Sequence, residues 1–145
     1  LTRRLKLWDI NVLDAIKNLN PKAIFIVTNQ GGIEKGLFPE SFIYVKCEYV
    51  NDSIMDYCDI NTRFMYCGSN DRNNPMRKPN TGMLEELFNN YKSWNDGLSE
   101  KDCLMIGDAS GLEGQFSDSD KKTAENFGID YMDVSEFVNI YGKGV

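Results

Sequence analysis

A short apolar run ends in a polar, glycine-bearing turn at residues 23–32, Ala23-Ile24-Phe25-Ile26-Val27-Thr28-Asn29-Gln30-Gly31-Gly32. The first five residues are rich in β-branched side chains, which is typical of a central parallel strand covered on both faces. A hydroxyl and free backbone N–H groups follow at once, and both can donate hydrogen bonds to phosphate oxygens. Taken alone, the stretch is equally compatible with an ordinary polar turn. As a site, it makes Thr28 the residue that would grip a phosphoryl group.

Short strands and amphipathic helices alternate along the rest of the chain. Apolar spacing predicts further strands at 62–67, 102–106 and 129–132, and helices at 8–19, 39–58, 81–91, 121–127 and 135–141. Thr81 is the expected N-cap of the third helix, and Gly128 the expected end of the fourth. This alternation predicts an α/β fold with a Rossmann-like, doubly wound parallel sheet, in which the polar strand ends converge on one site. We expect a single domain over residues 1–145.

The composition restricts the possible chemistry. The chain contains no histidine, which excludes histidine-based nucleophiles and general bases. Its four cysteines are scattered without a Cys-x-x-Cys pair, which argues against zinc and against a disulfide framework. A net charge of −6 argues against nucleic-acid binding driven by charge alone, and no apolar run is long enough for a membrane span or signal peptide. We therefore expect a soluble intracellular protein, cytoplasmic or nuclear, whose chemistry rests on Asp, Glu, Lys, Thr and metal.

Three charged residues are candidates for the site. Lys78 stands just before a predicted helix, where its ammonium can act as a point charge on phosphate, although a loop lysine is often simply solvent-exposed. Asp108 ends an apolar strand between small residues, so Mg²⁺ could approach its carboxylate without obstruction. Asp120 stands where a loop enters a helix. It is either an acidic helix start or a group that orients Lys78 or a metal-bound water.

Together and in this order, these segments resemble motifs two, three and four of the haloacid dehalogenase superfamily. A narrower resemblance, to the polynucleotide kinase 3′-phosphatase family, extends over nearly the whole chain. It rests on four stretches: Thr28-Asn29-Gln30-Gly31-Gly32-Ile33, Arg77-Lys78-Pro79-Asn80-Thr81-Gly82-Met83, Gly107-Asp108-Ala109-Ser110-Gly111 and Phe116-Ser117-Asp118-Ser119-Asp120. The ordered combination is far more specific than any one motif.

The resemblance implies a Mg²⁺-dependent phosphatase that forms an aspartyl-phosphate, with DNA 3′ ends as substrate and a role in DNA repair. It implies that Asp108 binds the metal and that no zinc is bound. The other implied roles are catalytic for Thr28, Asn29, Lys78 and Asp120, and substrate-binding for Gln30, Gly31 and Arg77. Because the segment between the second and third motifs is short, we expect no separate lid domain, or a minimal one, and a site open to a polymer end.

The sequence departs from the family at its first motif. Asp-x-Asp-x-Thr after an N-terminal strand supplies the nucleophile there, and Leu1–Trp8 contains no such strand. Either roughly 20 to 35 upstream residues are absent from this chain, about one strand and a loop, or the chain is a natural remnant. We favour the first explanation. We expect the 145-residue chain alone to lack phosphatase activity; Mg²⁺-dependent turnover of a 3′-phosphorylated oligonucleotide would show otherwise.

Two other functions stay open. The same chemistry could act on a small ester such as histidinol phosphate or a sugar phosphate. Relatives with those substrates commonly carry a Cys/His zinc loop before Arg-Lys-Pro, where this chain offers only Cys67. A third possibility is a non-catalytic module that kept the fold and binds phosphate. An upstream Asp-x-Asp-x-Thr would separate the enzymes from this module, and substrate preference would separate the two enzymes.

Overall fold

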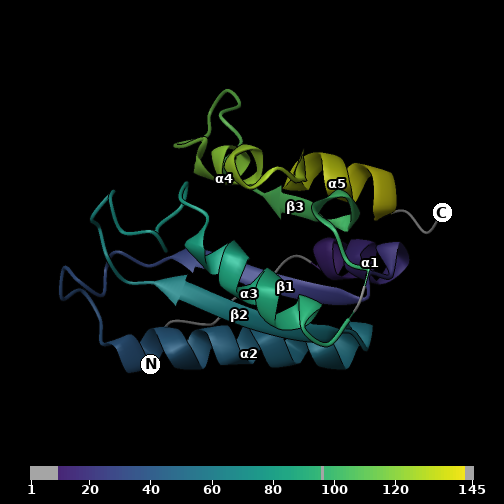
Figure 1. The fold of residues 1–145 in the computed structure, drawn as a ribbon, viewed down its shortest axis with the longest axis horizontal. Helices are drawn as coiled ribbons and strands as arrows, with labels where there is room; N and C mark the ends of the chain where they lie inside the picture. Colours follow the sequence, from purple (N-terminus) through teal and green to yellow (C-terminus); the bar gives the residue numbers. More distant parts are fainter. Residues whose placement is uncertain (1–9, 96, 143–145) are drawn as a thin grey trace.

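The computed structural model describes residues 10–95 and 97–142 (Figure 1). Its elements are α1 (Ile10–Leu19), β1 (Ala23–Asn29), α2 (Glu40–Cys58), β2 (Asn61–Cys67), α3 (Gly82–Lys92), the short 3-10 helix η1 (Glu100–Asp102), β3 (Leu104–Gly107), α4 (Ser119–Phe127), β4 (Asp130–Asp133) and α5 (Val134–Tyr141). Each predicted helix and strand is present, with bounds that differ by a few residues. The predicted start of the first helix, at Trp8, lies outside the described residues.

The strands form two parallel pairs. β1 pairs with β2 in a register that places Ala23 opposite Asn61, and β3 pairs with β4 with Leu104 opposite Asp130. The α/β class and the parallel strands are therefore confirmed. Among the described residues, no backbone ladder joins the two pairs, so the single sheet that we expected is divided in two.

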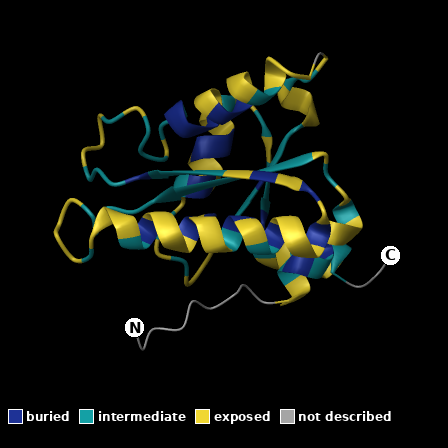
Figure 2. Cartoon of the chain, turned by 90° about the horizontal axis from the view of Figure 1, so that it is seen from below, coloured by how far each residue is buried: buried dark blue, intermediate teal, exposed yellow. Residues whose placement is uncertain are grey.

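β1 is less covered than its sequence predicted. All of its residues are partly exposed, although its run is strongly apolar. The expectation of a fully covered central strand was therefore wrong. In the described part of the chain β1 also lies at the edge of its sheet, because β2 is the one strand that pairs with it. Figure 2 shows the fold coloured by burial, with the buried residues concentrated on the inner faces of the helices.

Two clusters of buried side chains hold the strand pairs together. The first contains Ile16 of α1 and Phe137 of α5, and Ile26 of β1 and Met132 of β4 pack against it. The second joins α3, β3 and α4 to β1 through Leu84, Met105, Ala124 and Val27. Both clusters contain side chains from both strand pairs, so they pack the two pairs against each other. The strands β1, β2 and β3 point the same way, and their carboxyl ends lie on the same side of the molecule (Figure 1).

The helix ends match the sequence in one case and differ in another. α4 ends at Gly128, whose φ of 82° lies in the left-handed region that glycine adopts without strain. α3 begins after Thr81, but the Thr81 hydroxyl donates to the Glu85 carboxylate at 3.1 Å and makes no capping bond. Thr81 is therefore the N-cap residue, as predicted, but it does not cap with its side chain, because its backbone is not extended as in side-chain caps.

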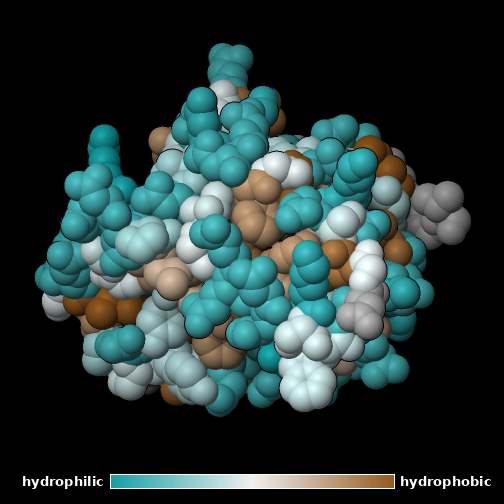
Figure 3. Space-filling model, in the orientation of Figure 1, coloured by the Kyte–Doolittle hydropathy of each residue, from teal (hydrophilic) through white to brown (hydrophobic). Residues whose placement is uncertain are grey.

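The face shown in Figure 3 is mostly hydrophilic, with a hydrophobic area near its centre. Large apolar side chains that stand out of the surface include Leu37 at 74%, Trp94 at 84% and Phe116 at 88% exposure. Within residues 10–95 and 97–142, none of the helices has the length and apolar character needed to cross a membrane.

Candidate functional site

Lys78 and Asp120 form an ion pair at the centre of the candidate site. The Lys78 Nζ lies 2.6 Å from Asp120 Oδ1, and the two side chains are only 12% and 9% exposed. Lys78 comes from the loop between β2 and α3, and Asp120 lies in the first turn of α4. Asp120 therefore orients Lys78 and also begins a helix. The lysine ammonium keeps two further donors for another anion.

Gly107 allows Asp120 to pack against the end of β3. A Cβ at Gly107 would stand 2.8 Å from both Cβ and Cγ of Asp120, which is well inside van der Waals contact. Asp120 Oδ2 in turn accepts a hydrogen bond from the backbone N–H of Ala109 at 3.2 Å. The carboxylate is thus held between the end of β3 and Lys78.

The side chain of Asn29 joins the end of β1 to the backbone of Lys78. Asn29 Nδ2 donates to the Lys78 carbonyl at 3.0 Å, and the Lys78 N–H donates to Asn29 Oδ1 at 3.0 Å. Both backbone groups of Lys78 are therefore bound by one side chain. Since Lys78 also contacts Asp120, three separate parts of the sequence meet, as the strand-end argument predicted.

Thr28 stands beside Asn29 at the end of β1. Its Oγ1 accepts a hydrogen bond from Gln30 Nε2 at 3.0 Å and lies 3.4 Å from the Asn29 carbonyl oxygen. Thr28 and Gln30 are both partly exposed. The hydroxyl that the sequence predicted to grip phosphate therefore lies in the same tripeptide that holds Lys78.

The loops after β1 and β2 are bound to each other. Asn70 Nδ2 donates to the Gly31 carbonyl at 2.8 Å, and a Cβ at Gly31 would meet Asn70 Cγ at 2.8 Å. Arg77 donates through a guanidinium N–H to the Ser69 carbonyl at 3.1 Å. Gly31 and Arg77 thus lie in the loops of the site and help to shape them, and their contacts with substrate stay predictions.

Asp108 follows β3 directly and its side chain is exposed. A carboxylate is the hard oxygen ligand that Mg²⁺ prefers, and Mg²⁺ is usually held by one or two carboxylates with water and substrate phosphate. In the described part of the chain, no group of three or more His, Cys, Asp or Glu side chains could enclose a metal ion. An exposed carboxylate such as Asp108 has the chemistry of a single Mg²⁺ ligand. Its role as that ligand stays a prediction.

A buried polar network that the sequence analysis missed fixes the loop carrying Asp108. Asp133, 8% exposed at the end of β4, accepts hydrogen bonds from Ser110 Oγ at 2.6 Å, Gln115 Nε2 at 2.7 Å and the Ser135 N–H at 2.9 Å. Burial raises the pKa of Asp133, but these bonds outweigh it and hold the pKa well below the usual range. The sequence offered one signal for this network: Asp133 stands just before the helix predicted at 135–141, and aspartate is a preferred N-cap residue.

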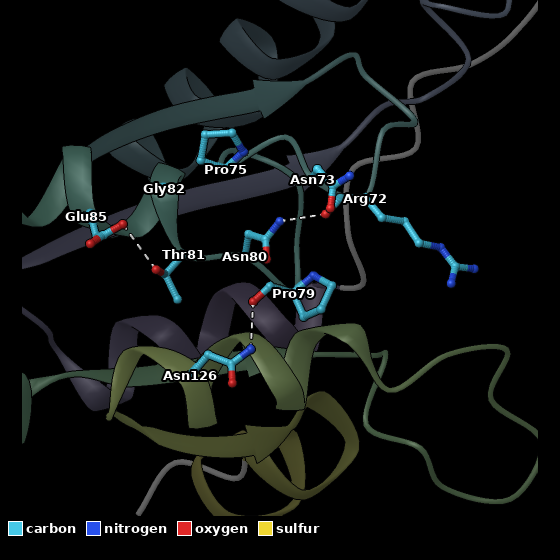
Figure 4. A pocket seen from close by; sticks show the side chains of 9 residues that line it. All are labelled: Arg72, Asn73, Pro75, Pro79, Asn80, Thr81, Gly82, Glu85 and Asn126. Atoms are coloured by element: carbon cyan, nitrogen blue, oxygen red, sulfur yellow. Dashed lines mark hydrogen bonds between the residues drawn. The ribbon is translucent and has the colours of Figure 1, made fainter.

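A hollow of about 450 Å³ lies beside the Lys78 loop (Figure 4). It is lined by Arg72, Asn73, Pro75, Pro79, Asn80, Thr81, Gly82, Glu85 and Asn126. Asn126 of α4 donates to the Pro79 carbonyl at 3.0 Å, and Asn80 donates to the Arg72 carbonyl at 2.9 Å. Its lining comes from both sides of Lys78 in the sequence, with Arg72, Asn73 and Pro75 before the lysine and Pro79 directly after it.

Comparison with known proteins shows which family the sequence is similar to. A family model described as polynucleotide kinase 3 phosphatase matches residues 2–138. A probable D-glycero-D-manno-heptose-1,7-bisphosphate 7-phosphatase of Thermoplasma volcanium is 30% identical over 95 residues. That similarity covers 65% of this chain and 62% of the relative, so the chain spans less than two thirds of the protein that it resembles.

Proposed function

Because the chain belongs to the polynucleotide kinase 3 phosphatase family of haloacid-dehalogenase-type proteins, we propose that it forms the phosphate-binding part of a phosphomonoesterase. We propose further that the substrate is a nucleic-acid 3′ end that carries a phosphate. The observation that carries this proposal is the Lys78–Asp120 ion pair, fixed by Asn29 beside the Thr28 hydroxyl. Thr28 and Asn29 come from the end of β1, Lys78 from the loop that follows β2, and Asp120 from the helix that follows β3. Open α/β sheets bind ligands beyond the carboxyl ends of their strands.

The residues of this chain have separate tasks in the proposed reaction. Thr28 donates its hydroxyl hydrogen to a phosphoryl oxygen. Lys78 contributes positive charge beside the phosphoryl group, whose charge must be stabilised during transfer. Asp120 holds the lysine in place. An aspartate of the first family motif, which this sequence lacks, would be the nucleophile.

Asp108 is the residue that we propose as a ligand for Mg²⁺. When bound, Mg²⁺ would supply further positive charge to the phosphoryl oxygens. The Asp108 loop is kept in shape by Ser110 and Gln115, which both donate to buried Asp133. Because a mobile loop would lose conformational entropy when its carboxylate binds a metal ion, a loop that is already fixed favours Mg²⁺ binding at Asp108.

The surface around the site favours a polymer end as substrate. Phe116, in the loop between β3 and α4, is 88% exposed and stands four residues before Asp120. An exposed aromatic ring is a platform on which a nucleobase can stack, at a gain of about 1–3 kcal/mol per base. The exposed Arg72 lines the neighbouring hollow and can approach a second phosphate.

A sugar phosphate is the second candidate substrate. The Thermoplasma relative is named for a heptose bisphosphate, and its similarity reaches 30% identity. The hollow of about 450 Å³ lies in the size range of small-molecule sites. Its polar lining of asparagines, Thr81 and Glu85 could bind sugar hydroxyls.

Hydrolysis by a protein in which an Asp-x-Asp-x-Thr strand precedes this sequence separates the two candidates. The substrates are one oligonucleotide with a 3′-phosphate, the same oligonucleotide with a 5′-phosphate, histidinol phosphate and heptose bisphosphate. We expect kcat/KM for the 3′-phosphorylated end to exceed the others by at least about tenfold. Higher kcat/KM for heptose bisphosphate would favour the second candidate. Lys78→Ala should abolish release of phosphate from every substrate, which controls for contaminating phosphatases.

A further inference from the structure

Three consecutive polar residues, Thr28, Asn29 and Gln30, stand at the end of β1 and in the turn that follows it. Gln30 donates to the Thr28 hydroxyl oxygen, and Asn29 binds both backbone groups of Lys78. We propose that Gln30 and Asn29 are positioning residues, which act on the phosphate through Thr28 and Lys78 and do not touch it. The inference rests on the proposed phosphate site, and it assigns new roles to a residue expected to bind substrate and to one expected to be catalytic.

Gln30 orients the Thr28 hydroxyl. A threonine hydroxyl has one hydrogen and two lone pairs. Since Gln30 Nε2 donates to Oγ1 at 3.0 Å, it occupies one lone pair and turns the hydrogen away from itself. The hydroxyl donates to the Asn29 carbonyl oxygen at 3.4 Å, which is a long and therefore weak bond for an O–H donor. The hydroxyl hydrogen is therefore readily given to a phosphate oxygen.

Asn29 fixes the backbone end of the lysine. Its two hydrogen bonds of 3.0 Å connect the last residue of β1 to the N–H and C=O of Lys78. At the other end, Asp120 holds Nζ at 2.6 Å. A lysine side chain is long and rotamer-rich, so fixing both ends removes entropy that phosphate binding would otherwise cost.

A double-mutant cycle tests the Gln30 role. Inorganic phosphate is titrated into the ¹⁵N-labelled chain and into Thr28→Val, Gln30→Ala and the double variant, and affinities are taken from NMR shifts. We expect about tenfold or greater loss for Thr28→Val and a smaller loss for Gln30→Ala. In the Thr28→Val background, Gln30→Ala should change nothing further. An equal loss in both backgrounds would show that Gln30 binds phosphate directly and would overturn its positioning role.

A second cycle pairs Asn29→Ala with Lys78→Ala. We expect Asn29→Ala to weaken phosphate binding about tenfold in the native background and to have no effect once Lys78 is truncated. Asn29→Asp keeps the acceptor for the Lys78 N–H but loses the donor, so its affinity should fall between the two. Asn139→Ala, an exposed asparagine on α5, should retain native affinity. Native affinity in Asn29→Ala would overturn the role of Asn29.

Failure of the inference and failure of the proposed function have different signatures. If Thr28→Val and Lys78→Ala leave phosphate affinity unchanged, or if no phosphate binds, the phosphate site itself is refuted. The positioning roles of Gln30 and Asn29 are then tested by NMR measurements in the absence of phosphate. Thr28→Val should shift the ¹⁵N signal of the Gln30 side-chain amide, and Asn29→Ala should accelerate hydrogen exchange at the Lys78 N–H. Unchanged signals in these two variants would overturn the inference.

Discussion

The Nζ of Lys78, in the loop between β2 and α3, lies 2.6 Å from Oδ1 of Asp120, in the first turn of α4. The pair connects the loop after β2 to the first turn of α4, and Asn29 connects the same lysine to the end of β1. One buried cation is thus held by two elements far apart in sequence. Since a buried charge is stable only when it is paired, the site and the fold depend on the same contact.

Asp120→Asn should destabilise the fold because it leaves the Lys78 ammonium without its counter-ion. We expect the free energy of unfolding to fall by about 3 kcal/mol in urea denaturation. Asp118→Asn is the matched control, because this aspartate is exposed in the same segment. Equal stability of the two variants would show that the ion pair has no structural importance.

Gly107→Ala should act on the same contact from the other side. The new Cβ would stand 2.8 Å from Cβ and Cγ of Asp120, so the carboxylate must move away from Lys78. We expect a loss of about 1–3 kcal/mol in stability and weaker phosphate binding. The measurements are urea denaturation and an NMR titration with inorganic phosphate. Native affinity for phosphate would mean that the site adapts to the displaced carboxylate.

The buried Asp133 predicts a dependence of stability on acid. Its pKa in the folded protein is lowered, whereas the unfolded chain should titrate near the ordinary value of 3.8. The stabilisation by Asp133 is therefore complete above that value and is lost as the pH falls below it. Asp133→Asn should lower stability by about 1–3 kcal/mol at neutral pH and flatten this acid-dependent loss. The measurement is the free energy of unfolding of the native protein and of Asp133→Asn between pH 5 and pH 2.5 (roughly the window set by linkage). Curves that run parallel over this range would contradict a stabilising role of ionised Asp133.

Phe116 should contribute to binding of a nucleic-acid end. Phe116→Ala should weaken binding of a 3′-phosphorylated oligonucleotide by about tenfold or more, because a stacked base is lost, and leave the affinity for inorganic phosphate unchanged. Leu112→Ala, an exposed apolar residue of the same loop, should have a smaller effect. Fluorescence anisotropy with a labelled oligonucleotide measures both. Equal losses for the two variants would mean that general apolar contact, and not stacking, is at work.

Local sequence signals predicted much of this fold. The strand at Ala23–Val27 and the end of a helix at Gly128 were predicted from residue types and their neighbours in the sequence. Both are present in the structure. The rule that parallel strands end at one edge of a sheet predicted that the residues after β1, β2 and β3 would meet. The contact of Lys78 with Asp120 was one of two readings of an aspartate at a helix start, and the structure shows that contact. Such rules use spacing along the chain and need no knowledge of tertiary packing.

Other features depend on contacts that spacing does not encode. Asp133 binds Ser110, which lies 23 residues away, and no periodic pattern connects the two. Whether β1 is a central or an edge strand depends on which strands flank it, and an apolar run looks the same with one partner or two. The contacts of Asn29 and Gln30 depend on side-chain direction within a turn, so a motif named the residues without giving their tasks.

The most direct test is an NMR titration of the ¹⁵N-labelled chain with two oligonucleotides that differ only in a 3′-phosphate or a 3′-hydroxyl. We predict that the 3′-phosphorylated oligonucleotide binds at least about tenfold more tightly. Its largest shifts should occur at Thr28, Lys78 and Asp120, and Lys78→Ala should remove the preference. Equal affinity for the two oligonucleotides, or shifts that avoid these three residues, would contradict a phosphate site at the ends of β1 and β3.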